Sequence, residues 1–319
     1  MSWQAAVVRW AIRRKMRRGP AVEDSLFGVA RDADPNSDAF VATVRRALDR
    51  TVASLPAPMR GTAVDRIETG TVRGEWITAP SVPRDAKRVI LYCHGGAFFW
   101  GNLAAPRNML ARLSRLTGAR VFSLDYRLAP EAPFPAALVD AAAAYAWLLE
   151  AQWYSPSQVI VGGESSGAGL VLSLLAALKG KTRVLPAAAF LFSPWTDLTL
   201  SGGSIETNAA SDPVLSAADL RWAAGLYLNG TAPDSARASP LFATLAGLPP
   251  ILLQTGSEEI LLDDSRRLAE TLQRHGGRCT LDVWPQMHHV WQLHSFFLPE
   301  GRRALTQVAR FIDETVAAA

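Results

Sequence analysis

From residue 88 to the C-terminus, short apolar runs alternate with longer segments of helical periodicity. Neighbouring parallel strands need a crossover of about a dozen residues, which a helix supplies. The alternation therefore predicts an α/β fold, with a mostly parallel central sheet covered by helices on both faces. Residues 62–78 partly alternate between polar and apolar, which predicts antiparallel strands before that region. The predicted parallel strands are residues 88–93, 120–124, 159–162, 187–192, 251–255 and 279–284, and the helices between and after them are residues 106–116, 135–150, 168–178, 264–275 and 302–317.

The rest of the chain predicts helices outside this core. Its 319 residues, of which 49% are apolar and 19% charged, suffice for one large α/β domain with additions. Helices are predicted at residues 3–16 and 37–55, and the helical stretch 205–230 interrupts the strand–helix alternation. We expect that stretch to lie over the carboxyl edge of the sheet as a lid. The predicted organisation is N-terminal cap helices at 1–55, core at 56–204 and 231–319, and a cap insertion at 205–230.

Positive charge is concentrated near the N-terminus. Residues 9–18 contain six Lys or Arg and no Asp or Glu, and without these six charges the formal net charge of +4 becomes −2. This argues against a nucleic-acid-binding protein. Trp3, Val7 and Trp10 lie at helical spacings, and the favoured interpretation is a helix packed on the protein, because most such stripes face a core. The alternative is a basic helix that contacts an anionic membrane or the substrate entrance.

The sequence contains only two cysteines and no recognisable targeting segment. Cys93 and Cys279 both lie in strand-like runs, which predicts no disulfide framework and suits a reducing compartment. We find no His and Cys cluster with metal-ligand spacing, so no metal or cofactor is expected. The first twenty residues do not match a signal peptide, and no apolar run is long enough to span a bilayer, which predicts a cytoplasmic protein. The oligomeric state stays open, a homodimer included.

The segment GESSG at residues 163–167 lies between a strand-like run and a helical run. Strand, G-x-S-x-G and helix is the context of a nucleophile elbow. Glycines allow the tight turn, and the serine oxygen lies near the helix N-terminus, where negative charge is favoured. We interpret Ser165 as a catalytic nucleophile. The alternative is a glycine-rich turn with a capping serine.

The segment HGGA at residues 94–97 follows the predicted strand 88–93. An oxyanion hole needs backbone amides that converge on one point, and side chains would obstruct that approach. Gly95 and Gly96 remove the obstruction, and with the Ser166 amide they predict an oxyanion hole. Which of the Gly95, Gly96 and Ala97 amides donate stays open.

A serine nucleophile needs a base, and the chain has five histidines. His94 belongs to the glycine loop and His275 to a helix end. His288, His289 and His294 follow the last predicted strand, where the base of such hydrolases lies. Spacing alone leaves His288 and His289 as close competitors.

The acid that orients the base is expected after the preceding strand, 251–255. Four carboxylates compete there: Glu258, Glu259, Asp263 and Asp264. The carboxylates that are not the acid are expected to cap the helix that follows.

Taken together, the motifs resemble the bacterial esterases similar to mammalian hormone-sensitive lipase. The matching segments are HGGAFFWGN, DYRLAPEAPFPAALVDAAAAYAWL, GGESSGAGL, SPWTDLT, GSEEILLDDS and WPQMHHVW, which run in the family's order from about Arg88 to the C-terminus. The resemblance implies an α/β-hydrolase fold with a helical cap. It also implies a triad of Ser165, Glu259 and His289, because the family's acid precedes a Leu by two residues and an Asp by four. The family's base follows a Gly-Met-x triplet, which is Gln286-Met287-His288 in this chain.

The chain departs from the family pattern near the site. The family's acid is more often Asp, Glu164 replaces a commoner Asp, and Ser166 replaces a commoner Ala. Ala97 stands where a third Gly is usual, and Ala132 where a His is usual. These departures keep every reacting group and alter the surroundings of the pocket.

The resemblance implies a carboxylesterase that acts on small-molecule esters of short to medium chain length, with lactones or acetyl esters included, through an acyl-enzyme. Phe98, Trp100, Trp195 and Trp291 flank the motifs and are predicted to line an apolar substrate pocket, with burial in the core as the alternative.

Two other functions compete with ester hydrolysis. The plant gibberellin receptors resemble this family but lack the catalytic histidine, and the presence of His289 favours an enzyme. Amide hydrolysis and acyl transfer to an alcohol would use the same triad.

Overall fold

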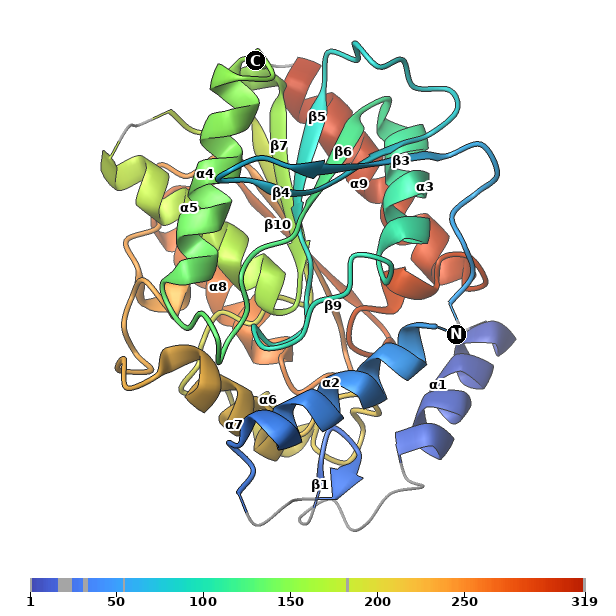
Figure 1. Cartoon of the computed structure of the whole chain (residues 1–319), viewed down its shortest axis with the longest axis vertical. Coiled ribbons are helices and arrows are strands. Elements are labelled where there is room, and N and C mark those ends of the chain that lie inside the picture. The colour runs from blue at the N-terminus through green and yellow to red at the C-terminus, as the bar shows by residue number, and fades with distance from the viewer. Residues whose placement is uncertain (1, 17–24, 31–33, 54, 182–183, 318–319) are drawn as a thin grey trace.

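The computed structural model describes residues 2–16, 25–30, 34–53, 55–181 and 184–317. Within them, a central sheet of eight strands has the order β10-β9-β8-β7-β5-β6-β4-β3 (Figure 1). The neighbours from β10 to β6 pair in parallel, whereas β4 pairs antiparallel with both β3 and β6. The strands are β3 (Ala63–Glu68), β4 (Arg73–Thr78), β5 (Val89–Cys93), β6 (Arg120–Leu124), β7 (Val159–Glu164), β8 (Ala188–Phe192), β9 (Ile251–Gly256) and β10 (Cys279–Trp284).

The helices that follow these strands cover both faces of the sheet. One hydrophobic core places residues of α3 and α9 against one face, and a second places residues of α4, α5 and α8 against the other. The fold class predicted from the alternation is therefore confirmed. The five helices are α3 (Arg107–Thr117), α4 (Ala136–Glu150), α5 (Ser166–Lys181), α8 (Leu262–Arg274) and α9 (Pro299–Ala317).

Burial explains why the strands could be recognised in the sequence as apolar runs. Every residue of β5 and β8 is buried, as expected for strands covered on both faces, so each appears as a continuous apolar run. By contrast, β3 at the edge alternates between half-buried and exposed side chains. The six predicted parallel strands are confirmed to within two residues at each end, and the five helices to within three.

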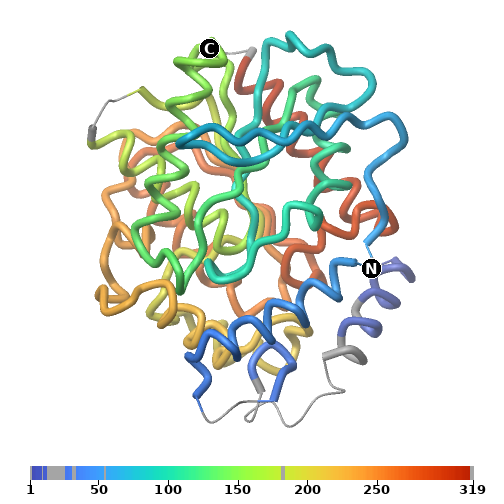
Figure 2. The backbone as a smooth tube through the Cα atoms, in the orientation of Figure 1, coloured from blue at the N-terminus to red at the C-terminus, as the bar shows by residue number. Residues whose placement is uncertain are grey.

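Further elements gather beyond the carboxyl ends of the parallel strands. They are α1 (Trp3–Met16), the short hairpin of β1 (Ser25–Leu26) and β2 (Val29–Ala30), α2 (Asp38–Val52), α6 (Ser204–Thr207) and α7 (Ala217–Leu228). The backbone tube shows the hairpin beside α7, although about 190 residues separate them (Figure 2). The Phe27 amide donates to the Asp219 carboxylate at 2.6 Å, and the Trp222 indole donates to the Pro35 carbonyl at 2.9 Å.

Two expectations for this region need correction. The stretch 205–230 is only partly helical: turns and loop separate α6 from α7, and Asn208 and Asp212 of this loop bond to neighbouring backbone. The helix at 3–16 exists, but it packs through Ala5 and Val8, and the stripe expected to face the protein is exposed. The division into core and cap at residues 55, 204 and 230 stays a prediction. Among the described residues, no helix combines the length and apolarity needed to cross a bilayer.

A pair of glycine substitutions in α5 tests how tightly the turn before this helix is packed. A Cβ at Gly167 would overlap the carbonyl oxygens of Cys93 and His94, whereas a Cβ at Gly180 meets nothing within 4 Å. We expect Gly167→Ala to lower the free energy of unfolding by at least about 2 kcal/mol, because backbone of the sheet must move. Gly180→Ala should stay within about 1 kcal/mol of the wild type. Denaturant unfolding measures both, and equal effects would contradict this packing.

Candidate active site

Ser165 lies at the junction between β7 and α5. Its backbone is in the left-handed region, with φ of 55°, which is uncommon for a residue with a side chain and marks a sharp turn. The Ser165 amide donates to the Phe192 carbonyl at 2.9 Å, and its carbonyl accepts from the Trp195 amide at 3.1 Å. The turn is thus held by the loop after β8, and Ser165 lines a cavity.

His289 and Glu259 are in direct contact. His289 Nδ1 lies 2.8 Å from Glu259 Oε2, and both side chains are buried. The loop after β10 carries the histidine and the loop after β9 carries the carboxylate. The two loops start side by side because these strands are parallel neighbours. His289 lines the same cavity as Ser165, whereas Glu259 lies behind it and does not.

The second oxygen of Glu259 is held by three donors. The hydroxyls of Ser193 and Thr255 donate to Oε1, each at 2.9 Å, and the Gly256 amide also donates to it. Ser193 Oγ accepts in turn from the Val290 amide, one residue beyond His289, at 3.1 Å. A buried carboxylate needs such donors, since without them its burial would be costly. Motif reasoning missed both hydroxyls, although Thr255 ends one predicted strand and Ser193 directly follows another.

The other carboxylates and histidines proposed from the sequence do not take part in the contact between His289 and Glu259. The Asp263 carboxylate accepts from the Ser204 amide at 2.8 Å, and the Asp264 carboxylate accepts from the Thr196 amide at 2.7 Å. Glu258 is half-buried one residue before Glu259. His288 lines the cavity with its ring centre 5.4 Å from that of His294, and burial lowers the pKa of His294 to about 4.

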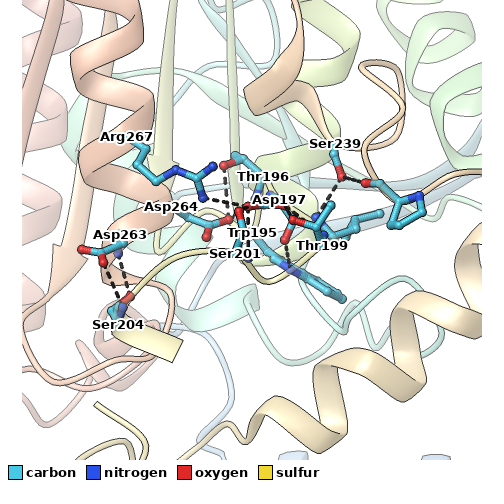
Figure 3. A network of polar contacts seen from close by, with 12 residues as sticks. Trp195, Thr196, Asp197, Thr199, Ser201, Ser204, Ser239, Asp263, Asp264 and Arg267 are labelled. Carbon is cyan, nitrogen blue, oxygen red and sulfur yellow. Dashed lines mark hydrogen bonds and ion pairs between the residues drawn. The ribbon is translucent and has the colours of Figure 1, made fainter. Parts of the chain in front are cut away.

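The two buried aspartates beside the acid loop form a network that motif reasoning also missed (Figure 3). Asp264 accepts from the amides of Thr196 and Asp197, and the Arg267 guanidinium pairs with Asp197 at 2.7 Å. Burial raises the pKa of Asp264 to about 7, although both amides act to lower it. The network ties the loop after β8 to α8, the helix that follows Glu259.

The glycine loop after β5 lies against Ser165 and lines the same cavity, since a Cβ on Gly95 would meet Ser165 Cβ at 3.1 Å. Gly96 has φ of 120°, and a Cβ there would overlap the Trp100 carbonyl, so glycine is required. Ala97 also has a left-handed backbone, with φ of 51°. The Tyr126 hydroxyl donates to the His94 carbonyl at 2.7 Å and steadies the start of the loop. Gly95, Gly96 and Ala97 all line the cavity, and Ser166 begins α5.

The cavity has a volume of about 390 Å³ and a mainly apolar wall. Trp100 lines it, as expected, but Phe98, Trp195 and Trp291 are not among its lining residues. Phe98 stacks on Tyr227 with ring centres 3.8 Å apart, and Trp195 and Trp291 are buried in hydrophobic cores. The lining residues that motif reasoning missed come largely from the elements beyond the sheet edge and include Ile12, Phe27, Leu48, Val52, Leu215 and Leu220.

The fold and the grouping of serine, histidine and carboxylate at the carboxyl edge of the sheet define a hydrolase of the α/β class. Residues 90–293 match the family described as having the alpha/beta hydrolase fold. An acetyl-hydrolase of Streptomyces hygroscopicus is 43% identical over 248 residues, which are 78% of this chain and 82% of the relative. An esterase of Acinetobacter venetianus is 38% identical over 246 residues, 77% of this chain and 80% of the relative.

A solved structure of an esterase from the bacterial hormone-sensitive lipase family superimposes with a TM-score of 0.88 and 38% identity, over 99% of each chain. The chain therefore belongs to the hormone-sensitive-lipase-like esterases of the α/β-hydrolase superfamily. It is a serine carboxylic ester hydrolase that acts on small-molecule esters. A cytoplasmic location and a homodimer stay predictions.

Glu164, which precedes Ser165, should make stability depend on pH. Burial raises the pKa of its carboxyl to about 7, against the lowering effect of the Gly95 amide and the Tyr92 hydroxyl. In an unfolded chain the pKa is about 4.3. Between pH 4 and 7 the native state then binds more protons, so this contribution to stability is lost as pH rises, by up to about 1.4 kcal/mol per unit.

We expect Glu164→Gln to flatten the fall in unfolding free energy between about pH 4 and pH 7. The exposed Glu206 supplies a control, and Glu206→Gln should leave the slope unchanged. Asp212 and Asp264 also have pKa values raised by burial, so part of the slope should persist. Denaturant unfolding at several pH values tests this, and the same slope in Glu164→Gln and wild type would refute it.

Proposed function

We propose that this protein hydrolyses carboxylic esters of short to medium chain length through a triad of Ser165, His289 and Glu259. The single observation that carries the proposal is the 2.8 Å contact between His289 and the buried Glu259, with the histidine on the same cavity as the serine. A carboxylate on Nδ1 fixes the tautomer of the imidazole and leaves Nε2 to act as the base.

In the proposed reaction, His289 takes the proton of Ser165 Oγ while the oxygen attacks the ester carbonyl carbon. The negative charge on the former carbonyl oxygen is stabilised by the Ser166 amide and by amides of the loop Gly95, Gly96 and Ala97. The C–O bond to the alcohol then breaks, and His289 gives its proton to the departing alcohol. Water, deprotonated by His289, attacks the acyl-enzyme and releases the carboxylic acid and the free serine.

The size of the cavity supports a small substrate. Its volume of about 390 Å³ lies near the lower end of the usual range for small-molecule sites, about 300–1,000 Å³. Its walls from α1, α2 and the loop before α7 are apolar, which suits alkyl chains. The similarity to an acetyl-hydrolase supports short acyl groups, acetyl esters included. Trp100 is the one of the four aromatic residues proposed from the sequence that we retain as a substrate contact.

Removal of the nucleophile gives the first test. We expect Ser165→Ala to lower hydrolysis of p-nitrophenyl acetate by at least about 10³-fold, because no other group can form the acyl-enzyme. A fluorophosphonate probe should label the wild type and not the variant. Denaturant unfolding checks that the variant is folded. A folded variant that keeps its activity, or a wild type that resists the probe, would refute the assignment and favour a ligand-binding role.

The choice of acid is tested by two isosteric variants. Glu259→Gln should lower kcat by roughly 10³–10⁴-fold, because a neutral amide cannot stabilise the charged imidazole. Asp263 contacts Ser204 and not His289, so Asp263→Asn should keep kcat within about tenfold, with the loss confined to a helix-end charge worth under about 1 kcal/mol. Ester hydrolysis by both purified variants decides the matter, and the reverse order of activities would show that the acid is Asp263.

A further inference from the structure

The glycine loop after β5 has a backbone that needs support from its surroundings. Ala97 and Phe98 both lie in the left-handed region, with φ of 51° and 65°. Residues with side chains keep such a backbone only where the structure around them enforces it. The amides of Phe99 and Trp100 donate to the Gly96 carbonyl, at 3.2 and 2.9 Å, and close the loop into a single turn. The position of this turn therefore depends on the elements that bind it from outside.

Arg45 of α2 binds the turn from beyond the edge of the sheet. Its Nε donates to the Phe99 carbonyl and its Nη2 to the Ala129 carbonyl, both at 2.7 Å. The Ala129 amide in turn donates to the Phe98 carbonyl at 2.9 Å. Nη1 and Nη2 also donate to the two carboxylate oxygens of Glu131, at 2.6 and 2.7 Å, and this paired contact fixes the plane of the guanidinium. One half-buried side chain thus holds two consecutive residues of the loop, one directly and one through Ala129.

Asp49 binds the same loop one helical turn after Arg45, on the same face of α2. Its carboxylate accepts from the Trp100 indole at 3.0 Å and from the Asn102 side-chain amide at 2.9 Å. Helix α2 therefore holds the loop at two points, and its Leu48 also lines the catalytic cavity.

We propose that Arg45 and Asp49 of α2 are positioning residues for the oxyanion hole: they fix the turn whose amides stabilise the negative charge of the tetrahedral intermediate. The proposal rests on the function proposed above, since it needs Ser165 to attack an ester beside this loop. Neither side chain is among the residues that line the cavity, so both act through the backbone of the loop. Amides that are already in place stabilise the transition state more than the bound ester, and this difference raises kcat.

The test compares Arg45→Lys with Arg46→Lys in the full chain. Lysine keeps the positive charge, but its ammonium does not reproduce the planar fork that reaches two carbonyls and a carboxylate. Outright loss of one oxyanion donor costs about 10²–10³-fold in kcat, so a loop that keeps its donors but is held less firmly should lose about 10–50-fold. The exposed Arg46 donates to Thr43 of the same helix at 2.9 Å, and Arg46→Lys should keep the wild-type kcat.

Inhibition by butylboronic acid separates positioning from folding. The boron forms a tetrahedral adduct with the serine oxygen, and this adduct resembles the transition state. Its inhibition constant should therefore rise in Arg45→Lys by about the factor by which kcat falls. Partial unfolding would lower the number of active sites, which a fluorophosphonate counts, and would leave the inhibition constant of the remaining sites unchanged. Asp49→Ala, at an exposed position, should change kcat and the inhibition constant in the same directions by a smaller factor.

Three results would overturn the proposal: wild-type kcat and inhibition constant in Arg45→Lys, an equal loss in Arg46→Lys, or a fall in kcat without a rise in the inhibition constant. If Arg45→Lys does not fold, Asp49→Ala takes its place, and a wild-type inhibition constant in that variant overturns the proposal. A wild type that resists both the boronic acid and the fluorophosphonate would refute the proposed triad, and this inference with it.

Discussion

Hydrogen bonds between parallel strands set the register of the sheet. This register fixes where each loop of the active site begins relative to the others. The ladder continues past the strand ends, since the Ser165 amide donates to the Phe192 carbonyl and the Ser193 amide to the Gln254 carbonyl. The turn that carries Ser165, the Ser193 hydroxyl that bonds to Glu259, and the loop that carries Glu259 are thereby fixed relative to one another. A shift of one residue in any of these pairings would turn side chains to the opposite face of the sheet. The 2.8 Å contact between His289 and Glu259 thus rests on backbone register first and on side-chain chemistry second.

Local sequence patterns were sufficient to predict the strands, the helices and the tight turn that carries Ser165. Strands buried on both faces must be apolar throughout, and a tight strand-to-helix turn must be glycine-rich, so both are visible within a few residues of sequence. Local patterns did not identify the candidate acid and base. Four carboxylates lie within residues 258–264, and their spacing says nothing about which one faces the imidazole. Family spacing selected Glu259 and His289, and these two are the pair in contact. Asp263 bonds instead to the first residue of α6, and Asp264 bonds to the loop after β8.

Side-chain surroundings were beyond the reach of sequence. Phe98, Trp195 and Trp291 lie beside catalytic motifs in the chain, yet each packs into a core, because neighbours in sequence on a loop point in different directions. The stripe of Trp3, Val7 and Trp10 has the spacing of a buried helical face but is exposed. Helix α1 is apolar on nearly all sides over its first ten residues, so periodicity could not show which side meets the protein.

The loops beyond the sheet edge belong to the same polar unit as the acid. The Asn208 side-chain amide donates to the Glu259 carbonyl at 2.9 Å, and the Asp212 carboxylate accepts from the Ile260 backbone amide at 2.9 Å. On the other side of the acid loop, Asp264 binds the loop after β8 (Figure 3). The Asp264 contact is buried, and the Thr196 amide that it binds would otherwise be left without a partner, at a cost of about 1–3 kcal/mol. The segment between α6 and α7 therefore has two parts: Val214 and Leu215 line the cavity, and Asn208 and Asp212 add hydrogen bonds to the loop that carries Glu259. The enclosure of the cavity and the placement of Glu259 thus depend on the same short segment.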